Sequence, residues 1–239
     1  MYNKKIISKI LITRLLPIGL LINAVIAMAQ PTVRLDTNMG IIEITLRPDV
    51  APIHVENFMT YVDDGDYNDS FFHRSVNGFI LQGGGFKYID QLFDYVPTDT
   101  PIVNEFSLSN LRGTVAMAKV GGDPDSATSQ WLINLADNAA NLDAQNGGFT
   151  VFAEVTAGME VVDAIAALPI VNFGSPIGSS LPMRNMPYDI PVDWGSHLVM
   201  INRASFDTFT IPMLPNLFML LLGLFIIVVG KRFQLRVNG

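Results

Sequence analysis

The stretch "FFHRSVNGFILQGGG", from Phe71 to Gly85, has the pattern of a β-hairpin and also some features of a site. Apolar residues alternate on both sides of an Asn77-Gly78 pair, which is a common turn sequence in hairpins. One arginine, Arg74, and one glutamine, Gln82, lie among large apolar side chains, and three glycines follow. The stretch is therefore either an ordinary hairpin with a polar outer face or part of a binding site.

Short strands and two helices are predicted around this hairpin. Residues 33–46 indicate two strands with a turn at 38–40, and further short apolar runs lie between clusters of Gly, Asn, Asp and Pro: 71–76, 79–82, 114–119, 130–135, 149–155 and 197–203. Residues 172–195, rich in Pro, Gly and Ser, are interpreted as a long loop. The pattern predicts a mainly β fold, a closed antiparallel barrel capped by helices, which would also leave no exposed sheet edge.

The two helices are expected near residues 51–65 and 158–168. Pro52 suits the first turn of the first helix, and Gly65 is a plausible stop. Apolar residues of this helix recur on one face, namely Val55, Phe58, Met59 and Val62. The second helix repeats the pattern with Val161, Val162, Ile165 and Leu168, so each helix would pack one face on the sheet.

The N-terminus, residues 1–29, has the pattern of a secretory signal peptide. Lysines at 4, 5 and 9 precede an apolar run over residues 15–29, and Ala27-Met28-Ala29 matches a cleavage site before Gln30. An uncleaved membrane anchor is the alternative. Pro17, Gly19 and Asn23 interrupt the run, which favours cleavage and an exported domain over residues 31–206.

The C-terminus carries a second apolar run. After a linker with prolines at residues 207–216, residues 217–230 are apolar except for glycines, and a basic tail follows at 231–239. Extended back to Ile211, the run reaches about the length that spans a bilayer, and the basic residues predict a cytoplasmic end. A buried core helix is the alternative. The tail also resembles bacterial sorting tails recognised by exosortase-type machinery, in which case it would be removed.

Composition excludes several classes of function. The chain has no cysteine, so it has no disulfides, no thiol nucleophile and no cysteine metal site. The two terminal segments hold seven of the 15 basic residues and none of the 22 acidic ones, which leaves residues 31–210 with a net charge near −14. So acidic a domain is a poor candidate for binding nucleic acid.

The motifs of common enzymes are also missing from the sequence. His54, His73 and His197 lie far apart without ligand spacing, so no metal or other cofactor is expected. A Ser-His-Asp hydrolase is not excluded by composition, but no G-x-S-x-G elbow is present, and no G-K-[ST] follows the glycines at 83–85. An apolar cavity with a few hydrogen-bond donors is what remains.

Several ordered motifs resemble the cyclophilins, a family of peptidyl-prolyl cis-trans isomerases. They cover most of residues 32–206: the helix and hairpin over 55–85, "LRGTVAMAK" at 111–119, "DSATSQWLINLADNAANLD" at 125–143 and "GGFTVFAEV" at 147–155. The resemblance implies a closed eight-stranded antiparallel barrel capped by two α-helices. A groove on its outer face would bind proline-containing polypeptide segments, and the protein is expected to be a monomer.

The resemblance also assigns site residues. It implies that Arg74, Gln82 and Phe79 are catalytic, with Arg74 as the central donor and Gln82 as its support. Substrate-binding residues would be Ile80, Ala118, Lys119, Gln130, Leu132 and Leu142. No metal is implied.

Five positions depart from the family pattern. Trp131 and Leu132 replace two phenylalanines, and Leu132 is the one expected to line the proline pocket. Asn141 replaces a frequent tryptophan that helps to bind cyclosporin, so weak drug sensitivity is expected. Lys119 and Glu154 stand where asparagine and glycine are common.

The register of the hairpin separates the two interpretations of the opening stretch. A two-residue Asn77-Gly78 turn would pair Arg74 with Leu81, whereas a three-residue loop pairs Arg74 with Gln82. A one-residue slip turns the side chains of one strand to the other face. The isomerase hypothesis requires the looser loop, with both side chains on one face, and we predict it. The alternative function is a low-turnover proline-peptide-binding or chaperone module tethered at the cell envelope.

Overall fold

The computed structural model describes residues 30–174, 176–185 and 193–206. The predicted signal peptide, linker, apolar tail helix and basic tail lie outside these residues. All described elements belong to one compact unit. Within the described part of the chain, no helix is long and apolar enough to cross a membrane.

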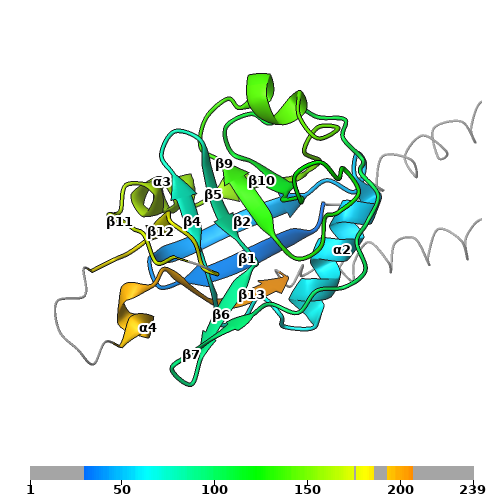
Figure 1. Cartoon of the computed structure of the whole chain (residues 1–239). Coiled ribbons are helices and arrows are strands. Elements are labelled where there is room, and N and C mark those ends of the chain that lie inside the picture. Colours follow the sequence, from blue (N-terminus) through cyan, green and yellow to red (C-terminus); the bar gives the residue numbers. More distant parts are fainter. Residues whose placement is uncertain (1–29, 175, 186–192, 207–239) are drawn as a thin grey trace, which may run out of the picture. The chain divides into compact units, whose positions relative to one another are not determined.

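One antiparallel sheet makes up most of the domain, as the alternating pattern predicts (Figure 1). Its strands are β1 (Thr32–Thr37), β2 (Gly40–Leu46), β3 (Ser70–Phe71), β4 (Arg74–Val76), β5 (Ile80–Gly83), β6 (Phe86–Ile89), β7 (Leu92–Tyr95), β8 (Thr114–Met117), β9 (Trp131–Asn134), β10 (Val151–Ala157) and β13 (Met200–Phe206). They follow the order β4-β5-β9-β8-β10-β2-β1-β13-β3-β6-β7, so the sheet is a long curled ribbon.

The closed eight-stranded barrel is not confirmed. The sheet has eleven strands, and among the described residues no ladder joins its two edge strands, β4 and β7. The Ser75 amide of β4 donates instead to the Ser180 carbonyl at 2.7 Å. A loop therefore covers this edge, which removes the need for closure by a further strand.

Two helices cover the sheet as predicted. Helix α2 (Pro52–Asp63) buries Val55, Phe58 and Val62, and α3 (Met159–Ala166) buries Val162 and Ile165. These side chains belong to a continuous core with large aromatic residues at its centre, namely Phe58, Tyr67, Phe72, Trp131 and Phe152. Both helices are short, so most of their stability comes from burying their apolar faces against the sheet.

The segment expected to be a long loop is partly regular. It contains β12 (Leu181–Pro182), paired with β11 (Ile170–Val171), and a short helix α4 (Trp194–His197). Apolar side chains of this segment form a second core with strands β3, β6 and β13, including Phe71, Phe86, Leu181, Leu198 and Met200. The prediction missed it because the strands are only two residues long and prolines and glycines dominate the sequence.

Candidate functional site

The β4–β5 hairpin has the looser register. Arg74 pairs with Gln82 and Val76 with Ile80, which leaves Asn77 to Phe79 as a three-residue loop. The Phe79 amide donates to the Val76 carbonyl at 2.9 Å, and Gly78 adopts a positive φ of 69°. The predicted register is confirmed, because Arg74 pairs with Gln82. Leu81 packs in the main core, and Ile80 lies on the opposite face of the hairpin.

The same alternation continues across three neighbouring strands. Gln82 of β5 pairs with Leu132 of β9, and Leu132 pairs with Ala116 of β8. The residues between them, Leu81, Ile133 and Val115, form the row that faces the main core. One face of the β5-β9-β8 sheet therefore belongs to the core, and the other carries the candidate site.

A chain of hydrogen bonds orients Arg74. Its Nη1 donates to Gln82 Oε1 at 3.1 Å, and Gln82 Nε2 donates to Gln130 Oε1 at 2.8 Å. An amide group has one acceptor and one donor end, so the contact with Gln130 turns the acceptor end of Gln82 toward Arg74. The three side chains are all partly buried, which strengthens these contacts relative to bulk water.

A pocket lined by both apolar and polar side chains lies beside this chain of hydrogen bonds. It encloses about 310 Å³ and is lined by Arg74, Phe79, Ile80, Gln82, Ala118, Lys119, Leu132, Leu142, Gln145 and Phe149. Gln130 lines an adjacent smaller cavity of about 130 Å³, which shares Gln82, Ala118 and Lys119 with the first. All nine residues expected at the site therefore line these two cavities, although the expectation did not include Gln145 and Phe149. Periodicity does not reveal these two residues, because they belong to an irregular segment.

The buried side-chain amides of three asparagines connect the two sides of the pocket. Asn138 donates to the Phe79 carbonyl at 2.8 Å and to Asn134 Oδ1 at 2.7 Å. Asn134 donates to Asn110 Oδ1 at 3.1 Å, and Asn110 donates to the Phe149 carbonyl at 2.9 Å. This network connects the tip of the hairpin with the opposite wall of the pocket. Since buried polar groups are costly without partners, the network favours a single arrangement of both walls.

The wall opposite the hairpin begins at a π-helix, η1 (Ala139–Asp143), which carries Leu142. Asp143 anchors this helix, because its carboxylate accepts from the backbone and side-chain amides of Asn110 at 2.9 and 2.8 Å. Leu142 is buried and contacts the floor formed by Ile80, Ala116, Leu132 and Val151. The floor and this wall of the pocket are thus built by four strands and one π-helix.

His73 lies behind the site and does not line it. Its side chain is buried against the Phe86 ring, with centroids 5.1 Å apart. Burial lowers the pKa of His73 to about 4, and the neighbouring positive charge of Arg74 acts in the same direction. The imidazole is therefore neutral at physiological pH and belongs to the packing of the hairpin.

The candidate site is built for binding and orientation. Among the described residues no group of three or more His, Asp or Glu side chains is placed to hold a metal ion. The groups that line the pocket are a guanidinium, an ammonium, side-chain amides and apolar surfaces. Such a set can bind an extended peptide and donate hydrogen bonds to it without proton transfer.

Comparison with known proteins identifies this architecture. Residues 32–185 match the family model of the cyclophilin type peptidyl-prolyl cis-trans isomerases. The chain belongs to the cyclophilin family. The peptidyl-prolyl cis-trans isomerase of Acinetobacter baylyi is 46% identical over 159 residues, which cover 65% of this chain and 82% of the relative. Peptidyl-prolyl cis-trans isomerase B of Escherichia coli is 45% identical over 135 residues, covering 54% of this chain and 80% of the relative.

A solved cyclophilin has a similar fold. A crystal structure of a cyclophilin type isomerase from Cryptosporidium parvum matches with a TM-score of 0.54 at 21% identity, covering 75% of this chain and 98% of that one. The mainly β cyclophilin fold expected from the motifs is thereby confirmed, as is the enzyme class, a peptidyl-prolyl cis-trans isomerase.

The departures from the family pattern lie at different depths in this cyclophilin domain. Trp131 is fully buried in the main core, where its ring meets Phe58 and Phe72 edge-on. Leu132 points to the other face and is almost fully buried at the floor of the pocket. Asn141 is exposed on η1 and hydrogen-bonds the side chain of Gln145. Of these three positions, Leu132 and Asn141 therefore lie where a peptide could sense the change, and Lys119, a further departure, lines both cavities.

Proposed function

We propose that the domain accelerates Xaa-Pro isomerisation in exported polypeptides and so assists their folding, with Arg74 as the catalytic donor. The observation that carries the proposal is the Arg74–Gln82–Gln130 chain beside a pocket of about 310 Å³ with apolar walls at Phe79, Ile80, Leu132 and Leu142. Phe79, Ile80, Leu132 and Leu142 would hold the proline ring, and Ala118 would run along the peptide.

The chemistry needs little more than this arrangement. Rotation about an Xaa-Pro bond is slow because the C–N bond has partial double-bond character, with a barrier of about 20 kcal/mol. In the twisted transition state the proline nitrogen recovers its lone pair. A guanidinium that donates to this nitrogen stabilises the twisted state more than either planar state, which lowers the barrier. Arginine suits the role because it donates in several directions and stays charged.

Gln82 would serve two roles in this mechanism. Its Oε1 accepts from Arg74 and holds the guanidinium over the pocket. The exposed part of the same amide lies next to the predicted path of the peptide backbone, because Gln82 lines both cavities. Preorganised donors are effective because they do not have to reorient during the reaction.

A low-turnover binding or chaperone module is the second candidate. Leu132 favours it, because the floor of the pocket lacks the flat aromatic surface common in the family. Asn141 also removes an apolar rim. In this case proline segments would bind without a matching acceleration of isomerisation.

The site of action is proposed from the termini. The signal-like residues 1–29 and the apolar run over 217–230 would place the domain outside the cytoplasmic membrane, held by a C-terminal helix unless exosortase-type machinery removes it. Mass spectrometry of the mature protein tests both ends. A mature chain that starts at Met1 would contradict cleavage of the signal, and one that ends at Gly239 would contradict sorting.

The activity is tested by the isomerisation rate of a proline-containing tetrapeptide with the purified chain and its Arg74→Ala variant. We expect acceleration by the wild type and a loss of about 10²–10³-fold in kcat for the variant, typical of removing one preorganised donor. Arg34→Ala is the matched control, since Arg34 lies on β1 in a half-exposed ion pair with Asp36 at 2.9 Å. Equal rates for wild type and Arg74→Ala would contradict the mechanism. Peptide binding without acceleration would favour the second candidate.

A further inference from the structure

Lys119 lies two residues beyond β8 and lines both cavities of the candidate site. Its Nζ donates to the Gly148 carbonyl at 2.7 Å, the Asn146 carbonyl at 2.8 Å and Asn104 Oδ1 at 3.2 Å. A lysine ammonium has three protons, and three acceptors of the chain itself use them. No donor of this side chain is left for a bound peptide.

The segment that Lys119 holds has an unusual backbone. Asn146, Gly147 and Gly148 all adopt positive φ, at 52°, 73° and 77°. For a residue with a side chain, such as Asn146, this conformation costs about 1 kcal/mol or more. The left-handed turn directs two carbonyl groups toward one point, where the ammonium binds them. The contacts with Lys119 thus offset the cost of this backbone conformation and the repulsion between the two carbonyl dipoles.

The strained segment leads directly into a wall of the pocket. Phe149 follows Gly148, lines the larger cavity and has the Lys119 ammonium 5.0 Å from its ring centroid. This distance allows a cation–π contact, so Lys119 acts on the ring as well as on the backbone. A Cβ at Gly148 would come within 2.3 Å of the Phe106 ring, so the segment is tightly enclosed. Phe106 therefore encloses the backbone at Gly148, and Lys119 contacts both this backbone and the Phe149 ring.

The third acceptor ties Lys119 to the rigid part of the domain. Asn104 Nδ2 donates to the Gly147 carbonyl at 2.7 Å, and Asn104 Oδ1 accepts from Thr150 Oγ1 at 2.7 Å. The Glu105 amide donates to Thr150 Oγ1 at 3.0 Å. Asn104 therefore binds Lys119, the strained turn and Thr150, the residue that precedes β10 (Val151–Ala157).

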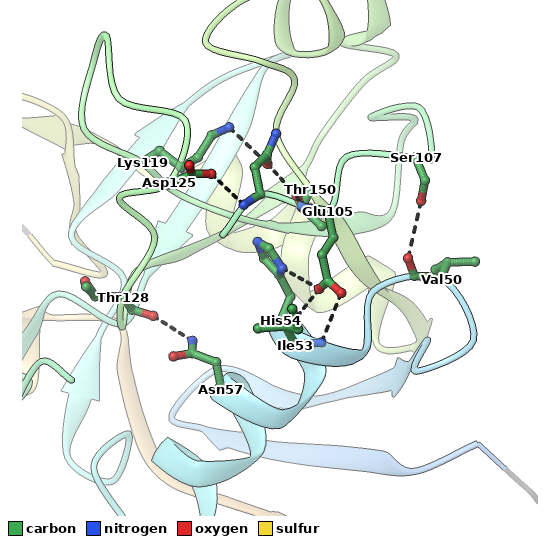
Figure 2. Close-up of polar contacts among 11 residues, drawn as sticks. Val50, Ile53, His54, Asn57, Glu105, Ser107, Lys119, Asp125, Thr128 and Thr150 are labelled. Atoms are coloured by element: carbon green, nitrogen blue, oxygen red, sulfur yellow. Dashed lines mark hydrogen bonds and ion pairs between the residues drawn. The ribbon is translucent and has the colours of Figure 1, made fainter. Parts of the chain in front are cut away.

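Glu105 extends this network to helix α2, as Figure 2 shows. Its carboxylate accepts from the backbone amides of Ile53 and His54 at 3.2 and 2.9 Å and from His54 Nδ1 at 2.8 Å. A carboxylate at this place satisfies free amides of the first turn and matches the helix dipole. The helix has no side-chain cap of its own, so Glu105 is its cap. The network that holds Lys119 is thereby anchored to the first turn of α2.

We infer that Lys119 is a positioning residue: it holds residues 146–149 so that Phe149 forms the wall of the pocket, and its ammonium does not itself bind the peptide. The inference rests on the proposed function. It makes a specific distinction from a substrate contact. A lysine that contacts the peptide directly would favour acidic substrates. A positioning lysine would instead affect the KM of every proline-containing peptide equally.

The test measures KM and kcat of the full chain and of its Lys119→Met variant with two proline-containing tetrapeptides. The residue two positions before proline is Glu in one peptide and Lys in the other. Met keeps the length of the side chain but none of its hydrogen bonds. We expect KM to rise about tenfold for both peptides, as for the loss of hydrogen bonds to a charged group, with kcat reduced much less. Lys119→Arg should recover most of the effect, because a guanidinium can also donate to two carbonyls. Lys87→Met, on β6 away from both cavities, controls for the change in net charge.

A second measurement is independent of catalysis. Hydrogen exchange should become faster at the Gly148 and Phe149 amides, which donate to the Gln145 and Leu142 carbonyls at 2.9 Å each. A KM change that differs between the two peptides by more than about threefold, or one without faster exchange, would overturn the inference, and so would unchanged KM. If the wild type shows no catalysis, the proposed function fails, and peptide Kd together with exchange still decides the role of Lys119. If Lys119→Met does not fold, Lys119→Gln takes its place.

Discussion

Gln130 provides the sharpest test of how the site is organised, because it lies two hydrogen bonds from Arg74, the proposed catalytic donor. It accepts from Gln82 Nε2 at 2.8 Å, and Gln82 in turn accepts from Arg74 at 3.1 Å. In Gln130→Leu the Gln82 amide loses its fixed orientation. Its NH₂ end can then turn toward the guanidinium, where donor faces donor.

The expected loss follows from the energy of the missing contact. A neutral hydrogen bond contributes about 0.5–1.5 kcal/mol, and about 1.4 kcal/mol corresponds to a tenfold change in rate. We therefore expect Gln130→Leu to lower kcat/KM by about twofold to tenfold, well below the loss for Arg74→Ala. The fold should persist, because the Gln130 carbonyl still accepts from the Ala118 amide at 2.9 Å and a change of this size is small against typical stabilities.

Gln130→Glu is the matched comparison for this prediction. A carboxylate keeps the acceptor that orients Gln82 but cannot donate when ionised. Steady-state isomerisation of one proline tetrapeptide by the three proteins is sufficient, with thermal unfolding to confirm that each is folded. We expect Glu to retain most of the activity that Leu loses. Full activity of the Leu variant, or equal losses in both variants, would refute the orienting role.

Three further predictions concern stability and the pocket. The folded-state pKa of His73 is about 4 against an ordinary value of 6.5, so between these pH values the unfolded state binds a proton that the folded state does not. The free energy of unfolding should therefore fall as pH drops from 6.5 to 4, by about 3 kcal/mol at pH 4. Urea unfolding of His73→Gln should show a correspondingly smaller dependence on pH. Gly84→Ala should lower the free energy of unfolding by roughly 2–4 kcal/mol, because φ is 75° and the new Cβ would lie 2.4 Å from the Ser129 carbonyl oxygen. Gly78→Ala, also at positive φ but in open space, should lower it by only about 1 kcal/mol. Equal melting temperatures of the two variants would contradict this. Leu132→Phe should lower KM for proline peptides about fourfold, as for one further buried CH₂, and an unchanged KM would show that the floor does not contact the ring.

Much of the fold was accessible from local pattern. The alternation in residues 33–46 predicts β1 and β2, and the 3.6-residue spacing in α2 predicts its buried face, because each depends on neighbours only a few residues away. The closed barrel was a prediction of a different kind. It required knowing what covers the β4 edge, and the answer, the Ser180 carbonyl, comes from a segment a hundred residues later that has no strand pattern.

The candidate site divides in the same way. Arg74, Gln82 and Ile80 could be placed on one face from the sequence, once the length of the loop was inferred, because a strand alternates strictly between two faces. Phe149 and Gln145 were missed, since they belong to an irregular segment whose course is set by the contacts of Lys119 and Asn110. Side-chain contacts of this kind leave no periodic signal.

The sequence by itself therefore determined the class of fold, the face of the hairpin that carries Arg74 and the enzyme family, because alternation and ordered motifs are local properties of the chain. Only the tertiary structure decided what each polar group does. Lys119 resembles a substrate contact in the sequence, but the folded chain supplies carbonyls 27 and 29 residues away that bind all but one of its protons, and Asn104 binds the last. Glu105 caps a helix that begins about fifty residues earlier. A polar side chain binds whichever partners the fold brings within about 3 Å, and these partners are known only when distant segments have met.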